Sequence, residues 1–317
     1  MLQPKDSFNF NVADLLSESP IEWSDSNKAF AAKLVSVAPD NLEGDIVFKV
    51  WAEIDLPQKI TDKCKFVVKE TFFDYSSDKQ HFDWYLNFAD PDLFGYYNSS
   101  LMAQDELQVF EHPVLAHLRE KLLSIGFYPE TTDDSRRPTP VTIKGAYRIC
   151  SVNTLLDEDG YSIYGNAFSR ASKEIIRKRV TPIIPPSKSN ILAIASLPSQ
   201  RGFYTEKQIE DILITAFSGF YAANYESDKL QMPRINSGFW GCGAYGGNRT
   251  IMTILQLVAA SLAGVELRYW AGDSSGVAVV EDAYQIYCDI LKKTGNTQDI
   301  INTLAKMKFD WGVSDGN

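Results

Sequence analysis

The sequence predicts a protein of the α/β class, and two observations support this. Apolar, β-branched segments such as IVFKVWA at 46–52 and NILAIAS at 190–196 lie between segments with helical periodicity. Strand and helix patterns then alternate over most of the chain, which is typical of a sheet covered by helices. With 317 residues, 44% of them hydrophobic, the chain can bury a sizeable core.

The first half of the chain contains these elements in order. Polar and apolar residues are mixed at the start, with short helices expected at VADLL and NKAFAAKLVSV and a strand at 46–52. A strand at 83–89, DWYLNFA, is followed by a loop, a helix over 101–110 and a second helix over 114–124. Pro113 separates these two helices, because proline cannot continue a helix.

The second half continues the alternation. Strands are predicted at VTIKGAYRI, NILAIAS and VELRYWA, and a basic helical segment at KEIIRKR. Thr205 and Gln208 form a capping box ahead of an amphipathic helix. A glycine-rich loop at 237–248 leads into an apolar helix that ends at Gly264, and a GDSSG turn leads into a last helix reaching Gly295.

Composition limits the classes of function. The net charge is -10, from 31 Lys plus Arg against 41 Asp plus Glu, which argues against general nucleic-acid or membrane binding through a basic surface. The four cysteines form no CxxC pair and the three histidines form no metal-binding pattern, so no metal is expected. Without an apolar run of about 18 residues or a signal peptide, we expect a cytoplasmic protein, although signal-independent secretion would leave no trace.

The glycine-rich loop SGFWGCGAYGGNRT predicts an anion site. Glycines let a phosphate approach the backbone, and the following helix points its positive end at the same place. Gly241, Gly243 and Gly246 also fit the GxGxxG spacing of a dinucleotide-binding fold, with Asp273 as the ribose-binding acid. That reading, an NAD-dependent oxidoreductase, needs a strand before the glycines, and LQMPRINSGFW with Pro233 predicts none there.

Two other motifs have simple explanations. GDSSG at 272–276 matches a nucleophile elbow, but no histidine follows it, so a polar turn at a helix start is favoured. Asp105 and Glu106 are adjacent on a helix and point about 100° apart, so they cannot flank one bond together. From the residues alone, they are two solvated acids that favour the helix dipole.

Taken together, these segments resemble the poly(ADP-ribose) glycohydrolase family. GFWGCGAYGG at 238–247 is similar to the family's diphosphate loop GNWGCGAFGG, and AFSGF before it is similar to AYCGF. NFADPDLFGYYNSSLMAQDELQVFEHPVL aligns with the family stretch that holds a triple glycine and the QEE signature. The resemblance implies a macrodomain-like three-layer α/β/α fold with a mixed central sheet, an accessory region at 1–80 and the core at 81–317.

The resemblance also implies the site residues. Gln104, Asp105 and Glu106 fall on the signature, with Glu106 as the catalytic glutamate and Asp105 as the shorter counterpart of a ribose-contacting glutamate. Of the triple glycine only Gly95 remains, because Phe94 and Tyr96 replace its neighbours. The other ligand-binding residues implied are Asn87, the adenine-loop residues Tyr161 and Tyr164, and the diphosphate-loop residues Gly241, Cys242, Gly243, Ala244, Tyr245, Gly246 and Gly247.

The activity implied is hydrolysis of ADP-ribose from an ADP-ribosylated protein, with no cofactor and no metal. A protonated Glu106 would donate to the leaving group and then activate water, and burial beneath Phe94 and Tyr96 would raise its pKa. The same two aromatics would fill space that a polymer needs, so single adducts are favoured over long chains. A binding module that has lost turnover is the alternative, and an NAD-dependent oxidoreductase is a lesser one.

Overall fold

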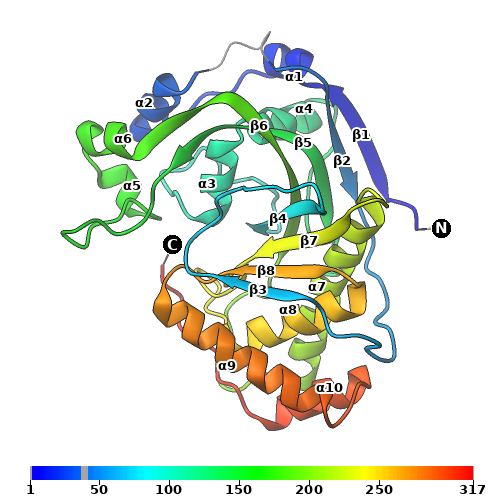
Figure 1. Ribbon diagram of the computed structural model, residues 1–317. Helices are drawn as coiled ribbons and strands as arrows, with labels where there is room; N and C mark the ends of the chain where they lie inside the picture. Colours follow the sequence, from blue (N-terminus) through cyan, green and yellow to red (C-terminus); the bar gives the residue numbers. More distant parts are fainter. Residues whose placement is uncertain (1, 37–41, 317) are drawn as a thin grey trace.

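The structure is a computed structural model that describes residues 2–36 and 42–316, and its centre is an eight-stranded sheet (Figure 1). The strands are β1 (Asp6–Asn11), β2 (Asp45–Val50), β3 (Phe66–Lys69), β4 (His81–Ala89), β5 (Val141–Val152), β6 (Val180–Ala195), β7 (Met232–Ser237) and β8 (Glu266–Trp270). The helices are α1 (Val12–Glu18), α2 (Ser26–Leu34), α3 (Gln104–Glu111), α4 (Val114–Ser124), α5 (Ala167–Arg170), α6 (Lys173–Arg179), α7 (Glu206–Glu226), α8 (Arg249–Ala263), α9 (Ser274–Leu291) and α10 (Thr297–Lys306).

The sheet is mixed, with the order β1-β2-β5-β6-β4-β7-β8-β3. Neighbours from β6 to β3 run parallel, whereas β1, β2, β5 and β6 pair antiparallel. The carboxyl ends of β4, β6, β7 and β8 therefore lie along one edge. In sheets of this kind, ligands bind in the crevice outside that edge.

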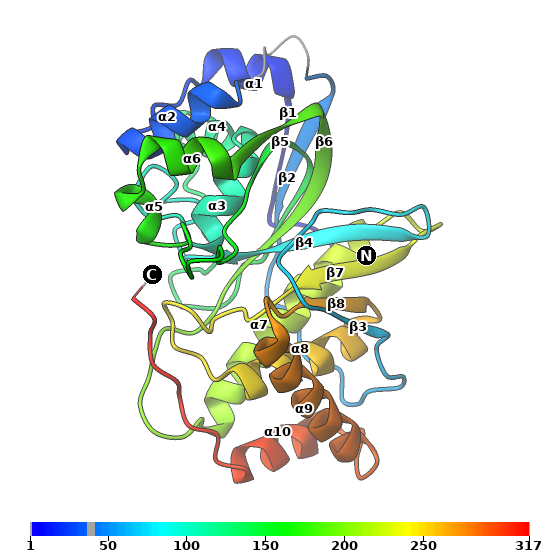
Figure 2. The same cartoon turned by 60° about the vertical axis from the view of Figure 1, so that its left-hand side comes forward.

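Each face of the sheet carries its own core, and β4 contributes to both. Trp84 and Leu86 pack with α7, α8, α9 and α10, whereas Tyr85 and Ala89 pack with α1 and α4. This alternation follows from the two-residue period of a strand. Figure 2 shows the two groups of helices on opposite sides of β4 and β7, so the predicted three-layer α/β/α class with a mixed central sheet is confirmed.

The elements follow the predicted order, with α4 and α6 at the expected residues and the Thr205–Gln208 capping box formed. The expectation that no strand precedes the glycine loop is wrong, because β7 lies there between β4 and β8. Pro233 is tolerated at the second residue of this strand. Its buried polar residues Arg234 and Asn236 are satisfied by Asp83 of β4.

The first 80 residues contribute to the same sheet. β1 and β2 form one end of it and β3 forms the other end, beside β8. The division at residue 80 into an accessory region and a core stays a prediction. Among the residues described, no helix is both long enough and apolar enough to span a bilayer.

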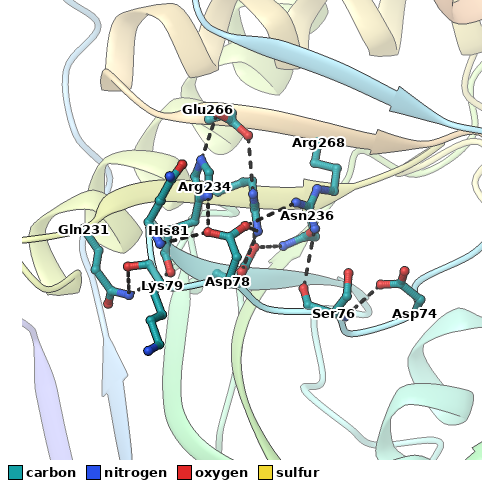
Figure 3. Close-up of polar contacts among 12 residues, drawn as sticks. Asp74, Ser76, Asp78, Lys79, His81, Gln231, Arg234, Asn236, Glu266 and Arg268 are labelled. Atoms are coloured by element: carbon teal, nitrogen blue, oxygen red, sulfur yellow. Dashed lines mark hydrogen bonds and ion pairs between the residues drawn. The ribbon is translucent and has the colours of Figure 1, made fainter.

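A buried ion-pair network joins β4, β7 and β8 near their amino ends, away from the carboxyl edge (Figure 3). Arg234, 2% exposed, donates to both carboxylate oxygens of Asp83 at 2.6 and 2.8 Å. Asp78 lies 3.1 Å from Arg234 and 2.7 Å from His81, and Glu266 lies 3.2 Å from His81. The hydrogen bond from His81 and the charge of Arg234 hold the pKa of Asp78 well below its usual range.

We predict that Arg234→Met lowers the free energy of unfolding by about 3–5 kcal/mol, because it leaves the Asp83 carboxylate buried without its partner. Urea unfolding at neutral pH measures this change. Arg137→Met is the matched control, since Arg137 is 64% exposed in its pair with Asp133 and should change stability by less than about 1 kcal/mol. Equal effects of the two substitutions would contradict the prediction.

Candidate active site

A pocket of about 290 Å³ opens at the carboxyl edge of the parallel strands. It lies where β4 leads to α3 on one face of the sheet and β7 leads to α8 on the other. The lining residues are Phe88, Ala89, Asp90, Tyr96, Leu101, Ala103, Gln104, Asp105, Glu106, Tyr164, Ser196, Trp240, Gly241, Gly243, Ala244, Tyr245 and Asp315.

Gln104 fixes the start of α3 against β4. Its side-chain oxygen accepts from the Phe88 amide at 2.7 Å, and its side-chain nitrogen donates to the Leu86 carbonyl at 3.0 Å. The Gln104 amide in turn donates to the Tyr164 hydroxyl at 3.1 Å. These hydrogen bonds hold the first turn of α3, which carries Asp105 and Glu106, at the carboxyl edge of the parallel strands.

Asp105 and Glu106 are buried, with exposures of 8% and 5%, so the solvated-acid interpretation is wrong. Burial, followed by the neighbouring Glu106 charge, raises the pKa of Asp105 to about 8. Burial also raises the pKa of Glu106, although backbone hydrogen bonds and Lys28 oppose it. A buried carboxyl that stays protonated near neutral pH can donate a proton.

The two acids differ in their hydrogen bonds. Asn87, fully buried on β4, donates to Asp105 Oδ1 at 3.0 Å, which fixes that side chain. Glu106 Oε2 and Asn87 Oδ1 have no hydrogen-bond partner within residues 2–36 and 42–316. Buried polar atoms of native proteins are rarely unsatisfied, so Glu106 Oε2 is available to a ligand or water in the pocket.

The glycine loop contributes residues with unpaired backbone N–H groups to the same pocket, as far as the described residues show. The amides of Gly241, Gly243, Ala244 and Tyr245 donate to no acceptor in the described part of the chain, and all four residues line the pocket. Gly241 has φ +74°, and a Cβ there would lie 2.4 Å from Ser196 Oγ, so only glycine fits. Unpaired backbone N–H groups on successive loop residues can bind an anion.

Other residues of the loop support it from behind. Gly246 and Gly247 use their amides within the loop, donating to the Gly243 and Gly241 carbonyls at 2.9 and 2.8 Å. Cys242 packs against the core instead of lining the pocket. Asn248 caps α8 by accepting from the Thr250 and Ile251 amides, so its side chain occupies part of the helix terminus.

The segment that replaces the family's triple glycine keeps a glycine-like backbone. Phe94 has φ +58°, a left-handed conformation that costs a bulky residue free energy. A Cβ at Gly95 would lie 2.1 Å from Asp92 Oδ2, so no larger residue fits there. Phe94 is buried in the core and does not line the pocket, whereas Tyr96 is 54% exposed and does. The expectation that both aromatics cover the site is therefore wrong for Phe94.

The two predicted adenine-loop tyrosines separate. Tyr164 lines the pocket and holds the Gln104 amide, whereas Tyr161 packs at the margin of the core formed by α2, α5 and α6. Asp273 is occupied as the N-cap of α9, where it accepts from the Gly276 amide at 2.8 Å. Asp273 is not among the pocket residues. The dinucleotide interpretation is therefore weakened, even though β7 supplies the strand that it requires before the glycines.

The sequence analysis did not identify three polar residues of the pocket, Asp90, Ser196 and Asp315. Asp90 follows β4 and accepts from the Tyr245 hydroxyl at 2.9 Å, and Ser196 follows β6. Their positions directly after parallel strands could have identified both. Asp315 had no local signal: residues 312–316 cross the glycine loop, and a Cβ at Gly243 would lie 3.3 Å from its Oδ2. The described residues contain no group of three or more His, Cys, Asp or Glu side chains able to hold a metal ion.

Comparison with known proteins identifies similar chains. Residues 140–278 match the family model for Poly (ADP-ribose) glycohydrolase (PARG), Macro domain fold, a range that includes the glycine loop but not Gln104, Asp105 or Glu106. The chain is also similar to poly(ADP-ribose) glycohydrolase from Thermomonospora curvata, with 13% identity over 89% of this chain and 86% of that chain and a TM-score of 0.46. It is similar as well to poly(ADP-ribose) glycohydrolase from Deinococcus radiodurans in complex with ADP-ribose. That match has 10% identity, covers 90% of this chain and 96% of that chain, and has a TM-score of 0.46.

We predict that Asp105→Asn stabilises the fold by roughly 1–3 kcal/mol near pH 7, with the gain shrinking as the pH falls toward 4. The folded-state pKa of Asp105 is raised to about 8, so the wild type loses stability as the pH rises from the unfolded value toward 8, and asparagine removes that loss. Thermal unfolding across this pH range measures it. Asp134→Asn, at an exposed position, is the control. A gain that does not vary with pH would refute the explanation.

Proposed function

We propose that the protein binds ADP-ribose and hydrolyses its glycosidic bond to a modified protein, and the match of residues 140–278 to the poly(ADP-ribose) glycohydrolase family model supports this proposal. The observation that supports this most is that one pocket combines two buried carboxyl groups with a row of unpaired amides. The first suits a glycosidic bond and the second suits a diphosphate.

In the proposed complex the diphosphate lies on the amides of Gly241, Gly243, Ala244 and Tyr245. The pocket lining contains no lysine or arginine, so backbone N–H groups and the nearby start of α8 supply the positive potential. Ribose then lies between this loop and the first turn of α3. Asp105, held by Asn87, orients a ribose hydroxyl, and Tyr164 offers a ring beside the adenine.

Glu106 is the proposed acid and base. Burial raises its pKa, which favours the protonated carboxyl, and in the proposed step this carboxyl donates a proton to the leaving atom as the bond to the anomeric carbon breaks. The resulting oxocarbenium-like carbon is attacked by water, and the Glu106 carboxylate takes the proton of that water, which regenerates the acid. The unpaired Oε2 gives this carboxyl a free position toward the pocket.

Single ADP-ribose adducts are the proposed substrates in preference to long polymer. Tyr96, half exposed at the pocket, supports this preference because its ring takes up space where the triple glycine would leave the backbone bare. Phe94 does not contribute, since it lies in the core. Replacement of Tyr96 by glycine therefore separates the two substrate classes more cleanly than a double substitution.

We predict that the wild type binds ADP-ribose in isothermal titration calorimetry and that Gly243→Glu weakens binding at least about tenfold. The substitution puts a carboxylate beside the phosphates in a pocket that already holds Asp315. Gly243→Ala is the matched control, because it adds the same Cβ without a charge. If the folded wild type shows no binding at an ADP-ribose concentration of about 1 mM, the proposed site is refuted.

We predict that Glu106→Gln keeps the fold and most of the ligand affinity but loses on the order of 10²- to 10⁴-fold in single-turnover release of ADP-ribose, because the amide cannot transfer the proton. Glu174→Gln, at a 75% exposed position on α6, is the control and should keep full activity. Substrates carry ADP-ribose on arginine, on acidic residues, on serine, or as polymer. Binding without release on any of them would favour a module that has lost turnover.

A further inference from the structure

The helix α2 carries a buried lysine that the pocket lining does not include. Lys28 has no exposed surface, and its Nζ donates to the Tyr97 carbonyl at 2.7 Å. The charges of Glu106, Asp25 and Asp105 all act on this ammonium. A lysine is almost never fully buried unless it is paired, so its position calls for an explanation.

The segment that Lys28 holds is the one that borders the pocket. Tyr97 follows Phe94, Gly95 and Tyr96, and Tyr96 lines the pocket. The Tyr97 ring packs edge-on against Trp23 at 5.7 Å, and its hydroxyl donates to Glu120 at 2.9 Å. Lys28 is therefore the point at which α2 contacts the backbone of this segment.

The lysine is itself fixed in place by its helix. Asp25 caps α2 by accepting from the Asn27 and Lys28 amides at 2.9 Å. The Asn27 side chain donates to the Phe168 and Ala171 carbonyls at 2.8 and 2.9 Å, which ties α2 to α5. Figure 2 shows α2 beside α6, on the side of the molecule where α3 and α5 lie. Lys28 is thus fixed in the interior by the packing of α2 rather than by flexible surface contacts.

We propose that Lys28 is a positioning residue for this site: it holds the segment 94–97 against the pocket and supplies the positive charge that the buried Asp105 and Glu106 face. This inference rests on the proposed function for its catalytic meaning. Without Lys28, two neighbouring acids and Asp90 would share a pocket that contains no other cation, since its lining has neither lysine nor arginine. A nearby ammonium favours the ionised form of a carboxyl, so it helps one of these acids to ionise during turnover.

Several charged groups act on Glu106, and the test must separate Lys28 from them. Lys28 on α2 lowers the pKa of Glu106, whereas Asp90 after β4 raises it, and Asp105 lies beside it on α3. Glu106 also acts on the Tyr164 hydroxyl. Burial lowers the pKa of Lys28 to about 8, so it remains mostly protonated at neutral pH.

The first measurement needs no activity. Glutamate carboxyls labelled with ¹³C are titrated by NMR, with Glu106→Gln identifying the Glu106 signal. We expect the pKa of Glu106 to rise in Lys28→Met and in Lys28→Gln, which keeps a donor without the charge, and to stay near the wild-type value in Lys28→Arg. An unchanged titration in a folded Lys28→Met or Lys28→Gln protein would overturn the inference. Near-ultraviolet circular dichroism confirms which variants are folded.

The second measurement is the pH profile of single-turnover ADP-ribose release. We expect Lys28→Met to lose on the order of 10- to 100-fold near pH 7 and the alkaline limb to move to higher pH, because Glu106 keeps its proton longer. A uniform loss with an unshifted profile would reduce Lys28 to a structural residue and overturn the inference. If the wild type releases no ADP-ribose, the proposed function fails while the NMR titration still decides the case of Lys28.

Discussion

The rest of the site depends on the hydrogen bonds between the side-chain carboxamide of Gln104 and the backbone of β4. These two hydrogen bonds, to Leu86 and Phe88, use backbone groups at the end of a strand that packs on both sides of the sheet. The position of α3 is therefore set by a buried strand in the interior of the sheet. The positions of Asp105 and Glu106 are fixed in the same way, because both lie in the helical turn that starts at Gln104.

The pocket places groups of opposite electrostatic preference side by side. The amides of the glycine loop favour a negative ligand, whereas burial makes negative charge on Asp105 and Glu106 unfavourable. Both conditions weaken the empty protein, since unpaired donors and buried acids reduce stability. A ligand with phosphates at one end and a neutral sugar at the other satisfies both groups, because its phosphates accept from the loop amides and its sugar lies beside the acids.

The sequence analysis correctly predicted the elements that depend on interactions between residues close together in the chain. The capping box of α7 and the helices on either side of Pro113 depend on residues three or four apart, so they were readable from the sequence. β7 was not, because its Arg234 and Asn236 look exposed until Asp83 is known to lie beside them. The burial of Asp105 and Glu106 and the place of Lys28 likewise depend on contacts between distant segments. The glycine loop was recognised as an anion site from its glycines and the helix that follows, but its spacing also fitted a dinucleotide-binding fold, and only the family resemblance favoured ADP-ribose.

The course of residues 312–316 has a practical consequence. This stretch runs along the glycine loop, with Ser314 beside Gly246 and the Gly316 carbonyl accepting from Asn166 at 2.9 Å. Any polypeptide joined after it leaves the molecule at the rim of the pocket. A purification tag or fluorescent fusion placed there would crowd the entrance and lower the apparent affinity, whereas β1 begins on the opposite side of the view from the carboxyl-terminal end (Figure 1).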